Sequence, residues 1–192
     1  WFAEKIQCIE DVFETSSGLL VVIGDVQITD ANLVPTGRTL LDNMKKIGKF
    51  SSKYHVLGCA TAFHAKMKPL IVPLPKNKRE TSGVLAHDIW IHALGESCRA
   101  KFILNKPLQF YRRHDDAVTS FNIDNPVHQL REFLASSSDP RPTFQQSEKI
   151  LAEVEERLRK IDTNGFDKSC LQAPVYELID QISNERKAIL NR

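Results

Sequence analysis

The sequence predicts an α/β domain followed by a helical hairpin. Two observations carry this prediction. The run at residues 19–23 is uniformly apolar and rich in β-branched residues, as in a strand buried on both faces, and other stretches repeat apolar residues at the three- and four-residue steps of amphipathic helices. With 192 residues, of which 42% are hydrophobic, the chain can form one sizeable core. We expect an α/β domain at residues 1–123 and a helical extension at residues 124–192.

The first 123 residues alternate between the two kinds of pattern. Gly24-Asp25 follows the apolar run and should end that strand, and Gly58-Cys59 lies inside a later strand candidate, where glycine often marks the close approach of another group. In chain order we expect a helix at residues 1–13, strands at 19–23 and 54–63 with a turn-rich stretch and a weak helix (39–47) between them, a surface loop at 69–82, a helix from about residue 88, and short strands at 101–104 and 108–112.

The extension contains a helical pattern near residues 127–135 and then two longer ones. The first of the longer helices opens with Thr143 and Gln146 at the spacing of a capping box and ends at Asn164-Gly165, and the second begins at Pro174. This hairpin could mediate homodimer formation, dock a partner or touch a membrane surface, or it could simply cover the α/β body.

The composition excludes several classes of protein. Lys and Arg total 26 against 24 Asp and Glu, so no electrostatic reason exists to expect a nucleic-acid partner. The four cysteines are far apart and form no Cys-x-x-Cys pair, which favours a reducing, cytoplasmic setting over a zinc site or a disulfide framework. The apolar run LLVVIG is far too short to span a bilayer.

The stretch HDIWIH places an acid at the start of a helical pattern. Asp88 could accept hydrogen bonds from the free backbone N–H groups of the first turn, which is the structural interpretation and the one that local sequence favours. A carboxylate held at a helix N-terminus could equally take a proton from a substrate hydroxyl group. These two roles compete only in part for the same oxygens.

The stretch PLQFYRRHDD ends a predicted strand with cationic groups. Arg112 and Arg113 could bind a diphosphate or lie in solvent, and His114 could be a metal ligand or an ordinary surface residue. Taken one at a time, these clusters leave the function open.

The order of the motifs along the chain is more specific. The succession W-x-x-x-K-I, LLVVIGD, GCATAF, HDIWI and KPLQFYRRHDD, over residues 1–123, resembles the second half of family 2 glycosyltransferases, especially the bacterial members that look like rhamnosyltransferases of surface polysaccharide synthesis. The resemblance implies a GT-A fold, a Rossmann-like mixed sheet flanked by helices. It also implies that the Asp-rich metal and donor motif of the family lies upstream of Trp1, so that the chain is one part of the enzyme.

The resemblance assigns roles position by position. Asp88 matches the catalytic base, and His114 matches the histidine that touches the metal or the diphosphate in many of these enzymes. The remaining matched positions are expected to bind donor or acceptor: Gly58, Cys59, His87, Trp90, Arg112 and Arg113. The implied cofactor is Mn or Mg, and the implied partners are a nucleotide-sugar donor and a glycan or lipid-linked acceptor at the cytoplasmic face of a membrane.

Two other classes of function remain open from the residues themselves. A non-catalytic carbohydrate- or nucleotide-binding protein would keep the aromatic and arginine contacts and use Asp88 only to cap its helix. A protein-interaction module would use the α/β part as a scaffold for the hairpin. In the first of these classes, substitution of Asp88 would cost stability rather than turnover.

Overall fold

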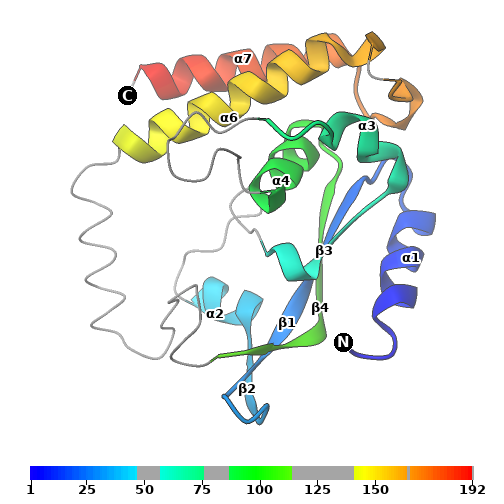
Figure 1. Ribbon diagram of the computed structural model, residues 1–192, viewed down its shortest axis with the longest axis vertical. Helices are drawn as coiled ribbons and strands as arrows, with labels where there is room; N and C mark the ends of the chain where they lie inside the picture. Colours follow the sequence, from blue (N-terminus) through cyan, green and yellow to red (C-terminus); the bar gives the residue numbers. More distant parts are fainter. Residues whose placement is uncertain (47–56, 76–86, 114–140, 164, 192) are drawn as a thin grey trace.

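The computed structural model describes residues 1–46, 57–75, 87–113, 141–163 and 165–191, and for residues 141–146 the backbone alone. This part of the chain is a mixed α/β structure with a four-stranded sheet and six α-helices (Figure 1). The helices are α1 (Lys5–Thr15), α2 (Leu40–Lys46), α3 (Lys68–Ile71), α4 (His87–Ser97), α6 (Arg141–Arg159) and α7 (Val175–Leu190). The strands are β1 (Val21–Thr29), β2 (Pro35–Thr39), β3 (Thr61–Phe63) and β4 (Lys101–Arg112). Short 3₁₀ turns are η2 (Gly58–Ala60), η3 (Ala65–Met67), η4 (Ile161–Thr163) and η5 (Lys168–Cys170).

Strand β1 is the centre of the sheet and pairs with the other three strands. β4 runs parallel to it along its whole length, from the pair Val21–Lys101 to the pair Thr29–Arg112. β3 is antiparallel and pairs with residues 21–23, and β2 is antiparallel and pairs with residues 27–29. Because β4 occupies one edge of β1, β3 and β2 must share the opposite edge, one at each end.

The strands are longer than the sequence predicted. The expected end at Gly24-Asp25 was wrong, since β1 continues to Thr29 with both edges paired and its residues mostly buried. The segment expected to be only turns contains β2, which forms a hairpin with β1. The two short strands expected around Pro107 are one strand, because two extra residues bulge out between the pairs Gly24–Leu104 and Asp25–Pro107.

The segment at residues 57–75 also differs from the prediction. Within the described residues the strand expected at 54–63 is shortened to β3, and Gly58 and Cys59 lie in the turn η2 that precedes it. Part of the expected surface loop is helix α3, whose Leu70 and Ile71 are buried. Residues 54–56 and 76–82 of those two predictions lie outside the described residues.

The elements stack in layers (Figure 1). Helix α1 lies on one side of the sheet, α2 and α4 lie on the other, and the α6–α7 pair packs beyond α4. The larger hydrophobic cluster runs from Val21 through Leu94 to Val154 and Leu178, so it joins residues on both sides of the boundary expected at residue 123. The expected helical hairpin is confirmed, and its described contacts are those of a cover on the α/β body.

The ends of the hairpin helices show which local signals held. α6 begins at Arg141, two residues before Thr143, so the predicted capping box at Thr143 was wrong. α6 ends at Arg159, five residues before the predicted end at Asn164-Gly165, and the turn η4 follows it. Gly165 itself has a φ of 70°, the left-handed conformation that favours glycine. α7 begins at Val175, one residue after the start expected at Pro174. The helix expected near residues 127–135 lies outside the described residues. None of the helices described is long and apolar enough to cross a bilayer.

Candidate functional site

The turn η2 places the Gly-Cys motif directly against the first turn of α4. A methyl group built on Gly58 would lie 3.1 Å from Oδ2 and 3.2 Å from Cβ of Asp88. Both residues are partly buried, and they come from two different elements of the fold. Two candidate residues taken from separate motifs are therefore neighbours in space, and a side chain at Gly58 would crowd the carboxylate.

The two oxygens of Asp88 have different surroundings. Oδ1 accepts a hydrogen bond from the backbone N–H of Ile89 at 2.8 Å, whereas Oδ2 is the oxygen nearest to Gly58. Asp88 is the second residue of α4, where the positive end of the helix dipole favours a negative charge. Oδ1 thus takes the structural role, and Oδ2, which faces the Gly-Cys turn, is left for the proposed role as a base.

Cys59 is held by two residues that come from the opposite side of the turn. Its carbonyl oxygen accepts a hydrogen bond from Nζ of Lys5 at 3.4 Å, and its Sγ accepts one from Nε2 of Gln109 at 3.2 Å. Nζ of Lys5 also donates to Oε1 of Gln109 at 2.5 Å, which links the two residues to each other. Helix α1 and strand β4 therefore both contribute a side chain to the turn.

Lys5 is an unusual cation because its side chain is buried, with 6% of the residue exposed. Its ammonium lies 4.1 Å from the centroid of the Trp1 ring, within range of a cation–π interaction. Burial lowers the pKa of Lys5, and an electrostatic interaction with Cys59 opposes this effect in part. The acceptors of Lys5 named above are a carbonyl and an amide oxygen, so burial of this charge is offset by hydrogen bonds rather than by a carboxylate.

The turn is tied to α4 at a second point, through Thr61 and His92. The hydroxyl of Thr61 donates to the carbonyl oxygen of Leu57 at 2.8 Å and lies 2.8 Å from Nε2 of His92. Because the single hydroxyl proton goes to Leu57, Nε2 of His92 must carry a proton and donate to Thr61. His92, which is 2% exposed, thus fixes the end of the turn relative to the helix that carries Asp88.

The two arginines lie at the end of β4. Arg112 is exposed and pairs with Thr29, and the backbone N–H of Arg113 donates to the carbonyl oxygen of Thr29 at 3.0 Å. The guanidinium of Arg113 is 5.8 Å from the ring of Tyr111, and Tyr111 packs on the small cluster formed by Ile23, Val26 and Ala60. Arg113 is therefore within range of a cation–π interaction at the end of β4.

Two further candidates on α4 have contrasting positions. His87 is exposed at the first residue of the helix. Trp90 is fully buried, donates its indole N–H to the carbonyl oxygen of Ile71 at 3.0 Å and lies 5.6 Å from the guanidinium of Arg157. In this structure Trp90 anchors α4 in the core, and its expected part in the acceptor pocket stays a prediction.

The acid at the end of the apolar run, Asp25, has a structural role. It is buried, and its Oδ1 accepts hydrogen bonds from the backbone N–H groups of Val26 at 2.8 Å and Leu41 at 3.0 Å. The second bond caps the start of α2. Asp25 therefore joins β1 to α2.

The expected metal ligand, His114, lies outside the described residues, so its role stays a prediction. Among residues 1–46, 57–75, 87–113, 141–163 and 165–191, no three His, Cys, Asp or Glu side chains gather as a metal site would require. The described donors alone do not build a complete ligand set for Mn or Mg.

Sequence reasoning missed Lys5, Gln109 and His92 as members of this site. All three lie inside motifs given above: Lys5 in W-x-x-x-K-I, His92 in HDIWIH and Gln109 in KPLQFYRRHDD. A lysine at a position of α1 that should face the core is the signal that could have revealed Lys5, because an unpaired cation is rarely buried.

Neither a protein-family model nor a characterised protein nor a solved structure matches this chain.

Proposed function

We propose that this chain is the acceptor side of a family 2 glycosyltransferase with a GT-A fold. The enzyme would transfer one sugar from a nucleotide-diphosphate donor to a hydroxyl group of a glycan or lipid-linked acceptor, in the synthesis of bacterial surface polysaccharide. The observation that carries the proposal is the contact between Gly58 and Asp88. These residues belong to GCATAF and HDIWI, two of the motifs that resemble the family, and a shared site is what their proposed roles require.

The chemistry assigned to Asp88 is general base catalysis. Oδ2 accepts the proton of the acceptor hydroxyl group while the hydroxyl oxygen attacks the anomeric carbon of the donor. The bond between that carbon and the diphosphate oxygen breaks, and its electron pair leaves with the nucleoside diphosphate. Attack in line with the leaving group inverts the anomeric configuration. The hydrogen bond from Ile89 to Oδ1 fixes the carboxylate, so Oδ2 points in one direction.

Charge on the departing diphosphate needs a cationic partner. Arg112 is exposed and Arg113 partly buried at the end of β4, which suits both guanidinium groups for contact with phosphate oxygens. His114 would be one ligand of a divalent ion, which when bound would stabilise charge on the leaving group. The exposed His87, next to Asp88, would contact the acceptor.

The test measures release of nucleoside diphosphate by the protein expressed from its complete reading frame, with Mn or Mg and a panel of nucleotide sugars. Asp88→Asn removes the base and keeps the shape of the side chain. We expect turnover to fall by about 10²–10⁴-fold, the usual contribution of a positioned base, while donor affinity persists. The matched control is Asp180→Asn, on the exposed side of α7, which should leave turnover unchanged.

Two results would overturn the proposal. Normal turnover in Asp88→Asn would show that Asp88 is not the catalytic base. Failure of every nucleotide sugar to bind would show that the proposed class of donor substrate is wrong. Donor binding without turnover in the wild-type protein would favour the non-catalytic binding function instead. A fall in melting temperature for Asp88→Asn without a change in turnover would assign Asp88 to helix capping alone.

A further inference from the structure

The turn η2 has few bonds of its own with which to hold its position. The backbone N–H of Ala60 donates to Leu57 at 3.0 Å, and the N–H of Thr61 donates to the carbonyl oxygen of Gly58. A single 3₁₀ turn of this length is not stable in isolation, since few hydrogen bonds compensate for the ordering of its residues. The place of the turn against Asp88 must therefore come from tertiary contacts.

Those contacts approach from two directions. From α4, Asp88 faces Gly58 and His92 holds Thr61. From α1 and β4, Lys5 donates to the carbonyl oxygen of Cys59 and Gln109 donates to its Sγ. The turn is thus held between the helix that carries the proposed base and a lysine–glutamine pair on the other side.

We propose that Lys5 and Gln109 are positioning residues, which hold the backbone of Gly58 and Cys59 at a fixed distance from the Asp88 carboxylate. Their hydrogen bonds reach the residue next to Gly58, so a shift at Cys59 moves the surface that Asp88 faces. The catalytic part of this inference rests on the proposed function, whereas the hold on the turn does not depend on it.

The burial of Lys5 supports a specific role. An ammonium group in the interior costs free energy that an apolar side chain of similar size would avoid, so its presence requires compensating contacts. Lys5 has three donors, and the structure directs them at Gln109 and Cys59 while the Trp1 ring lies 4.1 Å away. A methionine at this position would fill the volume but could bind neither oxygen.

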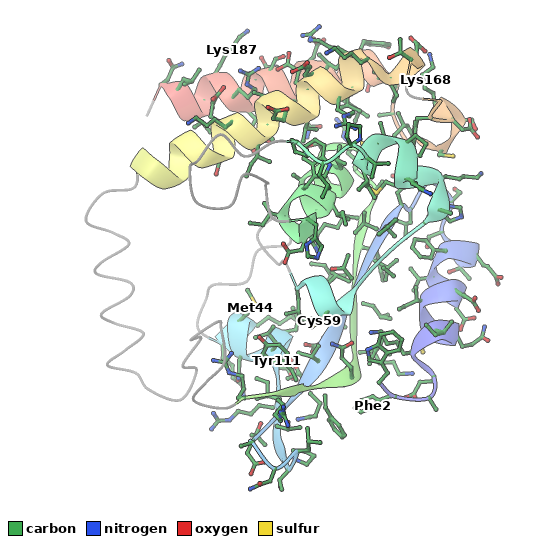
Figure 2. The ribbon with its side chains drawn as sticks, viewed as in Figure 1. Phe2, Met44, Cys59, Tyr111, Lys168 and Lys187 are labelled. Atoms are coloured by element: carbon green, nitrogen blue, oxygen red, sulfur yellow. The ribbon has the colours of Figure 1, made fainter. Side chains whose placement is uncertain are left out.

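The first test follows backbone hydrogen exchange of the peptide that spans residues 57–61, in the wild-type protein, Lys5→Met and Gln109→Met. We expect exchange at Ala60 and Thr61 to accelerate about tenfold in both variants, because the turn loses its hold from α1 and β4. Gln109→Glu keeps an acceptor for Lys5 but loses the donor to Sγ of Cys59, so it should restore part of the protection. Lys187→Met, on the exposed face of α7 and remote from Cys59 in Figure 2, is the matched control and should change nothing.

Peptides from α6 and α7 separate this local effect from general loss of stability. Their exchange should stay at the wild-type rate in Lys5→Met and Gln109→Met. Unchanged exchange at residues 57–61 in both variants would overturn the inference. Equal acceleration throughout the protein would overturn it as well, because the pair would then be ordinary core packing.

The second test measures kcat and KM of the same variants with the donor that the wild-type enzyme accepts. A positioning role predicts a lower kcat with little change in the KM for the donor, and partial recovery in Gln109→Glu. If exchange at the turn accelerates but the wild-type protein turns over no nucleotide sugar, the hold on the turn stands and the proposed function fails. If the wild-type protein is active and kcat does not change in either variant, the catalytic part of the inference is wrong.

Discussion

Substitution of Gly95 by alanine would test how closely the helix of Asp88 packs on the sheet. A Cβ atom at Gly95 would lie 2.7 Å from Cγ2 of Val21, closer than Cβ atoms approach other heavy atoms in proteins, and 3.0 Å from Cβ of Val21, which is also tight. Val21 is fully buried at the centre of the sheet and its β-branched side chain has little rotamer freedom. The helix must therefore move away from β1 to accept the methyl group.

The expected loss in the free energy of unfolding of Gly95→Ala is the difference between two effects. Overpacking of a well-packed core typically costs about 1–3 kcal/mol, and replacement of glycine by alanine in a helix gains about 1 kcal/mol at most. Because Gly95 lies near the end of α4, the gain should be smaller than that maximum. We expect a net loss of about 1–2 kcal/mol, which for a chain of this size lowers the melting temperature by about 2–8 °C.

The assay is thermal and chemical unfolding of Gly95→Ala, Val21→Ala and the double variant. Val21→Ala removes Cγ2, the closer of the two crowding atoms, and keeps Cβ, so in that background Gly95→Ala should cost less than in the wild-type protein, which gives a coupling energy of about 1 kcal/mol. Asn184→Ala, at an exposed position of α7, is the control for helix propensity alone and should be mildly stabilising.

An increase in melting temperature for Gly95→Ala in the wild-type background would refute the close packing of α4 on β1. Additive effects of the two substitutions would refute it equally. If the reasoning holds, the variant should also lose turnover beyond its loss of stability. Asp88 is two turns away on the same helix, about 10 Å along its axis, and would move with it.

Three further predictions concern the thiols, the hairpin and the contact between α6 and the body. A thiol reagent at mildly alkaline pH should modify the exposed Cys59 in the native protein but not Cys98, since burial removes access and raises the pKa of Cys98 to about 12. Mass spectrometry of the peptides would identify the modified cysteine, and fast modification of Cys98 would contradict its burial. Burial acts to raise the pKa of Glu155, but hydrogen bonds from two arginines and a serine outweigh it and keep this pKa below 4.5. The stability that this carboxylate contributes is therefore present above pH 4.5 and is lost as the pH falls through the lowered pKa. In urea unfolding, the stability of Glu155→Gln should fall less steeply at acid pH than that of the wild-type protein, and an identical acid dependence would refute the role. Arg157 donates to the carbonyl oxygens of Val72 at 3.0 Å and Pro73 at 2.6 Å. Arg157→Met should therefore lower the free energy of unfolding by about 1–3 kcal/mol and speed backbone hydrogen exchange around residue 72. Unchanged exchange there would contradict the contact.

Local pattern was enough to predict five of the six helices in the described residues, and it missed α3. The apolar periodicity predicted α1, α2, α4, α6 and α7 close to where they lie. Each of these helices presents one apolar stripe to the core, and that stripe is formed by residues three and four positions apart within one segment, so it can be recognised without knowing the rest of the fold. The ends were less accurate, as at Thr143, since helix termini depend on neighbouring backbone as well as on capping residues.

The strands needed partners to be recognised. β2 reads PTGRT, is exposed over most of its length and has no apolar alternation, so only its pairing with β1 makes it a strand. Pro107 suggested a break between two strands because proline lacks an N–H donor, yet the bulge at residues 105–106 absorbs the mismatch and β4 continues.

The sequence by itself determined the α/β class, the hairpin and a short set of candidate residues, among them Gly58, Cys59 and Asp88. Only the tertiary structure brought Asp88 against Gly58, buried Trp90 in the core and placed Lys5 on Cys59, 54 positions along the chain, and on Gln109, 104 positions along. The physical reason is the range of the forces involved. Periodicity records which face of one element avoids water, whereas a hydrogen bond or a close approach between elements depends on how the whole chain packs.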